Sequence, residues 1–219
     1  MDQDCDGEVD EGITAWLDQD GDGYGGALVS ICPDEGSPTV EVAEVRLAGI
    51  QGDDFAQPVL NPAEWVAGTW AGGAYTPGIS SGVLSIASPD GAFVRSTTLM
   101  PVTTLEAAVQ FTGAAWEHVG WGSQDFCCDY LLFSTANTTT NLFARSHTPS
   151  GELRTDLGPI PTGVHLYRID RQPSSPTTDV ISYFIDGLLR AQHTVPTQPP
   201  MFVYLSHNGG VSPTLNVHR

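Results

Sequence analysis

The sequence predicts an all-β protein: an antiparallel β-sandwich preceded by a small irregular module. From Val40 onward, turn signals recur about every ten residues, and apolar and polar residues alternate between them. Only residues 62–66 have a helical pattern. Strands separated by turns, without helices, are typical of antiparallel sandwiches. We therefore expect two parts, residues 1–39 and residues 40–219.

The expected strands are short runs of apolar and β-branched residues bounded by Gly, Pro, Asn or Ser. Alternation is clearest where Leu105, Ala107, Val109 and Phe111 are separated by more polar residues. Asp186-Gly187 predicts a tight hairpin turn. The expected strands are 40–48, 82–87, 91–98, 104–112, 117–122, 130–134, 141–146, 152–157, 164–170, 180–186, 188–195, 201–206 and 213–218.

The first part contains two Asp-x-Asp-x-Asp-Gly runs, which start at Asp2 and Asp18. Carboxylates at positions 1, 3 and 5, a glycine at 6 and a backbone carbonyl at 7 form the first half of an EF-hand-type calcium loop. Position 12 holds Ile13 and Val29 in place of the usual glutamate, so further oxygens must come from neighbouring acids or from sharing between the runs. The alternative is a solvated acidic tail. The expected Ca²⁺ ligands are Asp2, Asp4, Asp6, Glu8, Asp10, Glu11, Asp18, Asp20, Asp22 and Tyr24.

These runs resemble the Asp-rich repeats of thrombospondin type 3 modules and, more closely, those of large bacterial surface proteins. The match covers Asp2–Gly12 and Asp18–Gly25. The resemblance implies an extracellular calcium-binding module. Because the chain begins inside the first run, we expect either a mature product or an excised piece, and we prefer the second.

The charge of the chain is strongly negative and unevenly placed. The formal net charge is −18, and residues 1–35 carry eleven acidic residues and no basic one. All eight basic residues are arginines. Nucleic acids and anionic membranes are bound by basic patches, so we expect neither as a partner. No apolar run is long enough to insert into a membrane.

Four cysteines are compatible with an oxidising, extracellular environment. We prefer a Cys5–Cys32 bridge within the first part and a vicinal Cys127–Cys128 bridge. The alternative is that Cys127 and Cys128 are unpaired and buried.

The second part resembles concanavalin A-like jelly rolls of the laminarinase/LamG type. The resemblance rests on the order of three motifs over about 45–219: Asp53-Asp54-Phe55 with Leu60–Trp65, then Gly82–Ile86, then Tyr167–Asp170 with Tyr183–Gly187. It implies two stacked antiparallel sheets, with any sugar site on the concave one. It also implies a second calcium site at Asp53 and Asp54, although His218 stands where an aspartate is usual.

Laminarinase-type glucanases carry Glu-x-Asp-x-Glu or Glu-x-Asp-x-x-Glu on one concave strand, and none of the nine glutamates here has that pattern. We therefore expect no enzymatic activity. Convergence of Glu117 with Asp125 in a hydrolase is a less favoured alternative. We expect ligand binding by Trp116, His118, Trp121 and Arg145, because aromatic and polar neighbours suit sugar rings. For each tryptophan, a place in the core is the alternative.

The preferred function is an extracellular, calcium-binding, non-catalytic recognition or adhesion module that binds glycans or neighbouring surface proteins. The alternative is a structural subunit of a bacterial extracellular fibre or surface layer, assembled through shared calcium or strand addition. A glycoside hydrolase is the least favoured function.

Overall fold

The computed structural model describes residues 53, 55–101, 103–124, 129–208 and 210–218, with only the backbone of 211–213, and the backbone of Thr14–Leu17 and Ala27–Ser30. The chain divides into two compact units, Met1–Gly52 and Asp53–Arg219. The predicted boundary lay after residue 39. In the first unit, β1 (Thr14–Leu17) pairs antiparallel with β2 (Ala27–Ser30).

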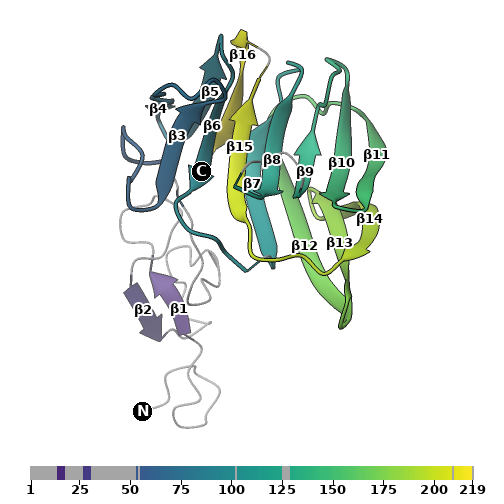
Figure 1. Ribbon diagram of the computed structural model, residues 1–219. Helices are drawn as coiled ribbons and strands as arrows, with labels where there is room; N and C mark the ends of the chain where they lie inside the picture. Colours follow the sequence, from purple (N-terminus) through teal and green to yellow (C-terminus); the bar gives the residue numbers. More distant parts are fainter. Residues whose placement is uncertain are drawn as a thin grey trace. The chain divides into compact units, whose positions relative to one another are not determined.

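The second unit consists of two seven-stranded sheets stacked face to face (Figure 1). The first sheet has the order β11-β10-β9-β8-β15-β6-β3, with bounds Gly151–Pro159, Asn141–Thr148, Tyr130–Ser134, Glu117–Gly122, Phe202–His207, Ala92–Ser96 and Trp65–Thr69. The second sheet has the order β14-β13-β12-β7-β16-β5-β4, with bounds Leu188–Pro196, Thr178–Ile185, His165–Ser175, Thr104–Gln110, Gly210–His218, Val83–Ser88 and Gly78–Ser80.

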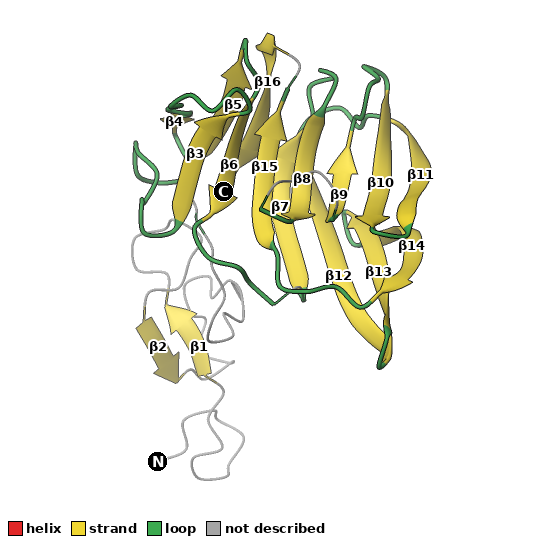
Figure 2. Cartoon of the chain, viewed as in Figure 1, coloured by secondary structure: helices red, strands yellow, loops and turns green. Residues whose placement is uncertain are grey.

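All strand pairs in both sheets are antiparallel, and the described part contains no helix (Figure 2). The predicted all-β sandwich is therefore confirmed. Within that part, no helix is long and apolar enough to cross a membrane. The expected strands from 82–87 to 213–218 are present with ends shifted by a few residues, whereas 40–48 lies outside the described residues.

The helical prediction for residues 62–66 is wrong, because the chain makes one turn and then extends into β3. The carbonyl oxygen of Asn61 accepts hydrogen bonds from the backbone nitrogens of Glu64 and Trp65 at 3.0 and 2.9 Å. From Trp65 onward, pairing with β6 replaces local hydrogen bonding. Long-range strand pairing therefore overrides the local helical preference.

Two hairpins of the second sheet turn through residues with positive φ. Asp186 and Gly187 have φ of 52° and 75°, as a type I′ turn requires, and join β13 to β14. The predicted Asp186-Gly187 hairpin is confirmed. Ser81 and Gly82, with φ of 54° and 73°, join β4 to β5 in the same way.

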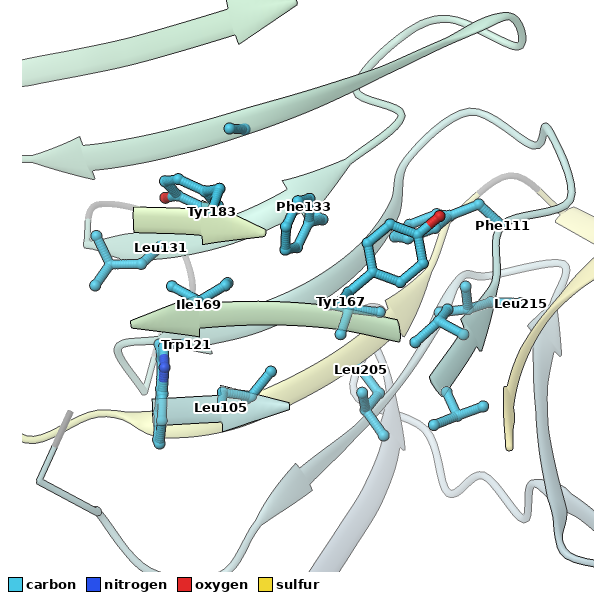
Figure 3. Packing of buried hydrophobic residues seen from close by; sticks show 14 of the residues in the cluster. Leu105, Phe111, Trp121, Leu131, Phe133, Tyr167, Ile169, Tyr183, Leu205 and Leu215 are labelled. Atoms are coloured by element: carbon cyan, nitrogen blue, oxygen red, sulfur yellow. The ribbon is translucent and has the colours of Figure 1, made fainter. Parts of the chain in front are cut away.

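The core lies between the sheets and is rich in aromatic rings. Phe133 of the first sheet meets Tyr167 and Tyr183 of the second, with centroid distances of 5.0 and 5.3 Å (Figure 3). Tyr167 also meets Phe111 edge-on at 5.1 Å. Since these side chains alternate with outward-facing ones, the core leaves a second set of residues on the outer face of each sheet.

Candidate active site

The outer face of the first sheet, meaning the side turned away from the core, carries three rows of cross-strand neighbours. Each row follows from the register of the strand pairs. The first row is Phe202, Gly122, Tyr130, His147 and Glu152; the second is Arg95, Tyr204, Gly120, Leu132, Arg145 and Arg154; the third is Phe93, Ser206, His118, Ser134, Phe143 and Asp156.

Three side chains of this face form a closed hydrogen-bonded cluster. The Tyr130 hydroxyl donates to Glu152 Oε1 at 2.9 Å, and Arg145 Nη2 donates to the Tyr130 hydroxyl at 2.7 Å. Arg145 Nε also donates to Glu152 Oε1. The three residues come from β9, β10 and β11, which are adjacent in the sheet. These hydrogen bonds hold a phenol, a carboxylate and a guanidinium in mutual contact.

The protonation states in this cluster are set by burial and by neighbouring charges. Burial raises the pKa of Tyr130 to about 12, although the charge of Arg145 opposes the rise. Burial also raises the pKa of Glu152, but hydrogen bonds from Arg145 and Tyr130 outweigh this and leave that pKa below its ordinary value. At neutral pH the pair is therefore a phenol that donates to a carboxylate. A carboxylate in this position can accept the proton of an attacking hydroxyl.

Aromatic rings lie on the same face, toward its other edge. Trp70 packs against Phe93 at 4.9 Å between centroids and stacks on Tyr204 at 6.3 Å with an interplanar angle of 15°. The Tyr204 hydroxyl donates to the Gln124 carbonyl at 2.9 Å, which fixes that ring. Tyr204 is 1% exposed, so of these three rings it is the partly exposed Trp70 and Phe93 that suit the apolar face of a sugar ring.

Three of the four predicted ligand-binding residues lie on or beside this face. Trp116 is 39% exposed and its ring is 6.2 Å from that of His118. Burial, with smaller contributions from the charges of Arg145 and His207, lowers the pKa of His118 to about 3, so its ring is neutral. Arg145 belongs to the cluster with Tyr130. Trp121 differs from the prediction: it is three residues from His118 in the same strand, so it points into the core, where it is 3% exposed (Figure 3).

Glu117 is not on the outer face. It is fully buried, and its carboxylate accepts hydrogen bonds from the backbone nitrogens of Thr112 and Gly113 at 3.1 Å and from Thr112 Oγ1 at 2.7 Å. These bonds fix the connection between β7 and β8. Asp125, its suggested partner, lies outside the described residues. Glu117 is therefore a structural residue.

The predicted metal ligands cannot be placed on the described part of the chain. Asp2, Asp4, Asp6, Glu8, Asp10, Glu11, Asp18, Asp20, Asp22 and Tyr24 lie outside it, as do Cys5, Cys32, Cys127, Cys128 and Asp54. Asp53 uses its carboxylate within the fold, since it accepts from Phe55 N at 2.7 Å and Trp65 Nε1 at 2.8 Å. Among the described residues, no group of three or more His, Cys, Asp or Glu could hold a metal ion.

Tyr130 and Glu152 are not among the site residues predicted from the sequence. Tyr130 is the first residue of β9, a strand that was predicted correctly, and Glu152 is the second residue of β11. The alternation of Glu152, Arg154 and Asp156 could have indicated a charged face on β11. Their proximity to Tyr130, however, depends on the register of three strands.

No protein-family model matches the chain, and no curated protein sequence matches it significantly. Solved structures do match. A β-glucanase of Bacillus licheniformis has a TM-score of 0.53 and 18% identity, over 75% of this chain and 92% of that one. A glycosyl hydrolase family protein from Mycobacterium fortuitum has a TM-score of 0.52 and 15% identity, over 75% and 94%. Porphyranase B from Zobellia galactanivorans has a TM-score of 0.53 and 15% identity, over 75% and 87%.

These matches show that the second unit has the predicted concanavalin A-like jelly-roll fold. At this identity they show the fold alone. Because the structures named above that share this fold are glycoside hydrolases by name, the fold contradicts two predictions, a non-catalytic recognition module or structural subunit and the absence of enzymatic activity. The missing Glu-x-Asp-x-Glu or Glu-x-Asp-x-x-Glu pattern excludes one arrangement of catalytic groups and does not exclude catalysis as such.

Proposed function

We propose that the protein cleaves or transfers glycosidic bonds at the outer face of the first sheet, with Tyr130 as nucleophile and Glu152 as its base. The observation that carries the proposal is the 2.9 Å hydrogen bond from the Tyr130 hydroxyl to Glu152, with Arg145 2.7 Å from the same oxygen. A weak nucleophile beside an oriented base is the arrangement that covalent catalysis needs. Arg145 stabilises the phenolate charge that develops during attack.

The proposed reaction has two displacements. The Tyr130 oxygen attacks the anomeric carbon while its proton passes to Glu152, and the departing sugar oxygen takes a proton from His147. Water then attacks the same carbon and returns a proton to His147, while the Tyr130 oxygen leaves and recovers its proton from Glu152. His147 is suited to this role because it lies directly across from Tyr130, with ring centroids 5.2 Å apart. A second sugar in place of water gives transfer.

A pair of carboxylates is a weaker basis for the reaction on this face. Retaining hydrolysis by two carboxyls needs them about 5–5.5 Å apart. Glu152 and Asp156 are the acids in the three rows, and four residues of extended strand separate them by roughly 13 Å. Asp156 is also engaged by Asn141 Nδ2 at 2.9 Å. The phenol–carboxylate pair is therefore the better candidate.

The proposal is tested by incubating the full chain with neutral and charged β-glucans and β-galactans and measuring new reducing ends. We expect turnover that Tyr130→Phe lowers by roughly 10²-fold or more, since the nucleophilic oxygen is removed while the ring is kept. Glu152→Gln should give a similar loss. Tyr75→Phe is the matched control, because the Tyr75 hydroxyl accepts a hydrogen bond from Ala87 N of the second sheet at 3.0 Å. This substitution should leave turnover unchanged.

A trapping experiment decides whether Tyr130 itself reacts. A fluorinated aryl glycoside that slows the second displacement should leave a sugar on the peptide that contains Tyr130, detected by mass spectrometry. No turnover on any of the polysaccharides, or turnover that Tyr130→Phe leaves intact, would overturn the proposal.

We also propose that the residues Asp2 to Tyr24 bind Ca²⁺ and that the protein works outside the cell. The spacing of the two Asp-x-Asp-x-Asp-Gly runs supports calcium binding, and calcium loops of low affinity would suit the calcium-rich exterior of the cell. Calorimetric titration and thermal melting with chelator or with millimolar calcium are the tests. Binding of about two ions with a rise in melting temperature is expected; the absence of both would mean an acidic tail.

A further inference from the structure

Three of the eight arginines lie in one row of the outer face of the first sheet, which we call the arginine row. It consists of Arg95, Arg145 and Arg154, linked across the strands by Tyr204, Gly120 and Leu132. Arg95 and Arg154 are five strand spacings apart, or roughly 24 Å. In a chain of net charge −18, this row is a concentration of positive charge on one face.

Each guanidinium of the row lies over an aromatic ring of the same face. The Arg154 Cζ is 3.6 Å from the Phe143 ring centroid, the Arg95 Cζ is 4.3 Å from that of Phe202, and the Arg145 Cζ is 5.1 Å from that of Tyr130. Stacking on a ring restricts a guanidinium. Hydrogen bonds fix two of the groups further, from Arg95 Nη1 to the Ser96 carbonyl at 2.9 Å and from Arg145 to Glu152 and Tyr130. The three groups are therefore oriented in advance of any ligand.

Arg95 and Arg154 differ from two of the arginines of the second sheet in their carboxylate partners. Arg168 pairs with Asp170 at 3.2 Å, and Arg171 pairs with Asp179 at 2.7 Å. Over the described part of the chain, no ion pair involves Arg95 or Arg154, and Arg145 pairs with Glu152. The acids of the same rows are Glu152, which is engaged by Arg145, and Asp156, which is engaged by Asn141.

We propose that the arginine row selects polysaccharides that carry anionic substituents, sulfate or carboxylate, for reaction at Tyr130. This rests on the proposed function, since it names the substrate class of that site. Planar guanidinium groups match both anions with paired hydrogen bonds. The row passes through Arg145, so a chain bound along it runs beside the Tyr130 hydroxyl. Neutral polysaccharides would leave the charge of Arg95 and Arg154 without a counterpart.

The test is binding, measured with Tyr130→Phe protein so that cleavage does not interfere. The probes are a β-glucan and a β-galactan, each in neutral, sulfated and carboxymethylated form, in affinity electrophoresis at constant ionic strength. We expect binding to at least one charged form and none to its neutral parent. Arg154→Gln and Arg95→Gln should each weaken that binding about tenfold. Preference between the two charged forms identifies the anion.

Arg168→Gln is the matched control, because this arginine also lies over a ring, 4.2 Å from the Phe184 centroid, but in the second sheet. It should bind as the parent does. Equal binding of neutral and charged forms, no binding of any charged form, or an equal loss in Arg168→Gln would overturn the inference. If Tyr130-dependent cleavage of a neutral glucan is found without preference for charged forms, the inference about the arginine row is overturned and the proposed function stands. If charged forms are bound selectively but no cleavage depends on Tyr130, the proposed function is overturned and the selectivity of the arginine row stands.

Discussion

Tyr167 and Tyr183 both pack against Phe133, yet their hydroxyl groups have opposite surroundings. The Tyr183 hydroxyl donates to the Arg145 carbonyl at 2.8 Å and lies 2.8 Å from Ser146 Oγ. The Tyr167 hydroxyl is buried and, within the described part of the chain, has no hydrogen-bond partner. Burial raises the pKa of both groups, so both stay protonated. One hydroxyl is therefore satisfied and the other carries an uncompensated desolvation cost.

Removing the two hydroxyl groups should change stability in opposite ways. Tyr183→Phe should lower the free energy of unfolding by about 1–2 kcal/mol, because Ser146 and the Arg145 carbonyl lose a buried partner. Tyr167→Phe should leave it unchanged or raise it, since a buried unsatisfied oxygen is removed. Urea unfolding of both variants is the measurement. An equal loss in Tyr167→Phe would show that its hydroxyl has a partner after all.

Gly120 should tolerate no side chain, because it lies between Tyr204 and Leu132 in the arginine row. A Cβ there would overlap the Leu131 carbonyl oxygen and lie 2.6 Å from Leu132 Cα. Gly120→Ala should therefore cost about 3 kcal/mol or prevent folding. In Gly78→Ala, the control, the new Cβ lies 3.8 Å from Ser85 Cβ, so the change in stability should stay within about 1 kcal/mol. Thermal melting distinguishes the two, and similar melting temperatures would contradict the close packing at Gly120.

The fold was predictable from sequence because its signals are local. Alternation in residues 105–111 and the Asp186-Gly187 pair identify β7 and one hairpin without reference to any distant residue. The strand β3 was not predictable in this way. Pro62, Ala63 and Glu64 are typical of a helix start, and only pairing with β6, some thirty residues later, extends the chain at Trp65.

The candidate site was less predictable because its parts come together only through register. Tyr130, Arg145 and Glu152 belong to three strands, and a shift of one residue in any of them would turn a side chain into the core. Trp121 illustrates the same limit, since the prediction placed it with His118 although the period of two puts them on opposite faces. The side of the sheet on which a residue lies decides its role here.

The buried pair of Arg171 and Asp179 should be important for stability. Asp179 Oδ2 accepts from Arg171 Nε at 2.7 Å and from Gln198 N at 2.8 Å, and the aspartate is fully buried. Asp179→Ala removes a fully buried carboxylate from a guanidinium that is 13% exposed and takes away the acceptor of Gln198 N, so we expect a loss of about 3–5 kcal/mol in urea unfolding. Asp170→Ala, which breaks the more exposed pair with Arg168, should cost less than about 1 kcal/mol. Comparable losses would mean that burial does not distinguish the two pairs.

The ion pair of His165 and Asp186 should give stability a pH dependence. His165 Nδ1 lies 2.7 Å from Asp186 Oδ2, and this contact raises the pKa of His165 and lowers that of Asp186. The His165 contribution is fully present below its ordinary pKa of 6.5 and is lost as pH rises through the higher folded value. The Asp186 contribution is lost only as pH falls through a value below 3.8.

Wild-type protein should therefore be more stable than Asp186→Asn between about pH 4 and 6.5, and the difference in stability between the two proteins should shrink above pH 7. Asparagine retains the positive φ of the turn and one acceptor oxygen, so the change removes the charge and one of the two acceptors that Leu166 N and His165 use. Both groups are exposed, which limits the effect to less than about 1 kcal/mol. Melting temperatures from pH 5 to pH 9 are the measurement. A difference that does not vary with pH would contradict the ion pair.

Glu117→Gln should affect stability and leave catalysis alone. The amide nitrogen of glutamine would face the backbone N–H groups of Thr112 and Gly113, so at least one buried donor loses its partner, at a cost of about 1–3 kcal/mol. Turnover per folded molecule should stay within about twofold of wild type, because Glu117 lies off the outer face. A loss of turnover like that of Tyr130→Phe would restore Glu117 as a catalytic residue.

The loss of stability in Glu117→Gln should depend on pH, and the pKa of Glu117 fixes the direction of this dependence. Burial raises the pKa of Glu117 above its ordinary value of 4.5, in spite of hydrogen bonds from Thr112 and the backbone of Gly113 and Ala114 that lower it. The folded protein therefore holds this proton more tightly than the unfolded chain, and wild-type stability falls as pH rises from 4.5 through the raised value. Glutamine has no such proton. The deficit of Glu117→Gln relative to wild type should thus be largest near pH 4 and shrink toward pH 7, and a deficit that grows over this range would contradict the buried carboxyl.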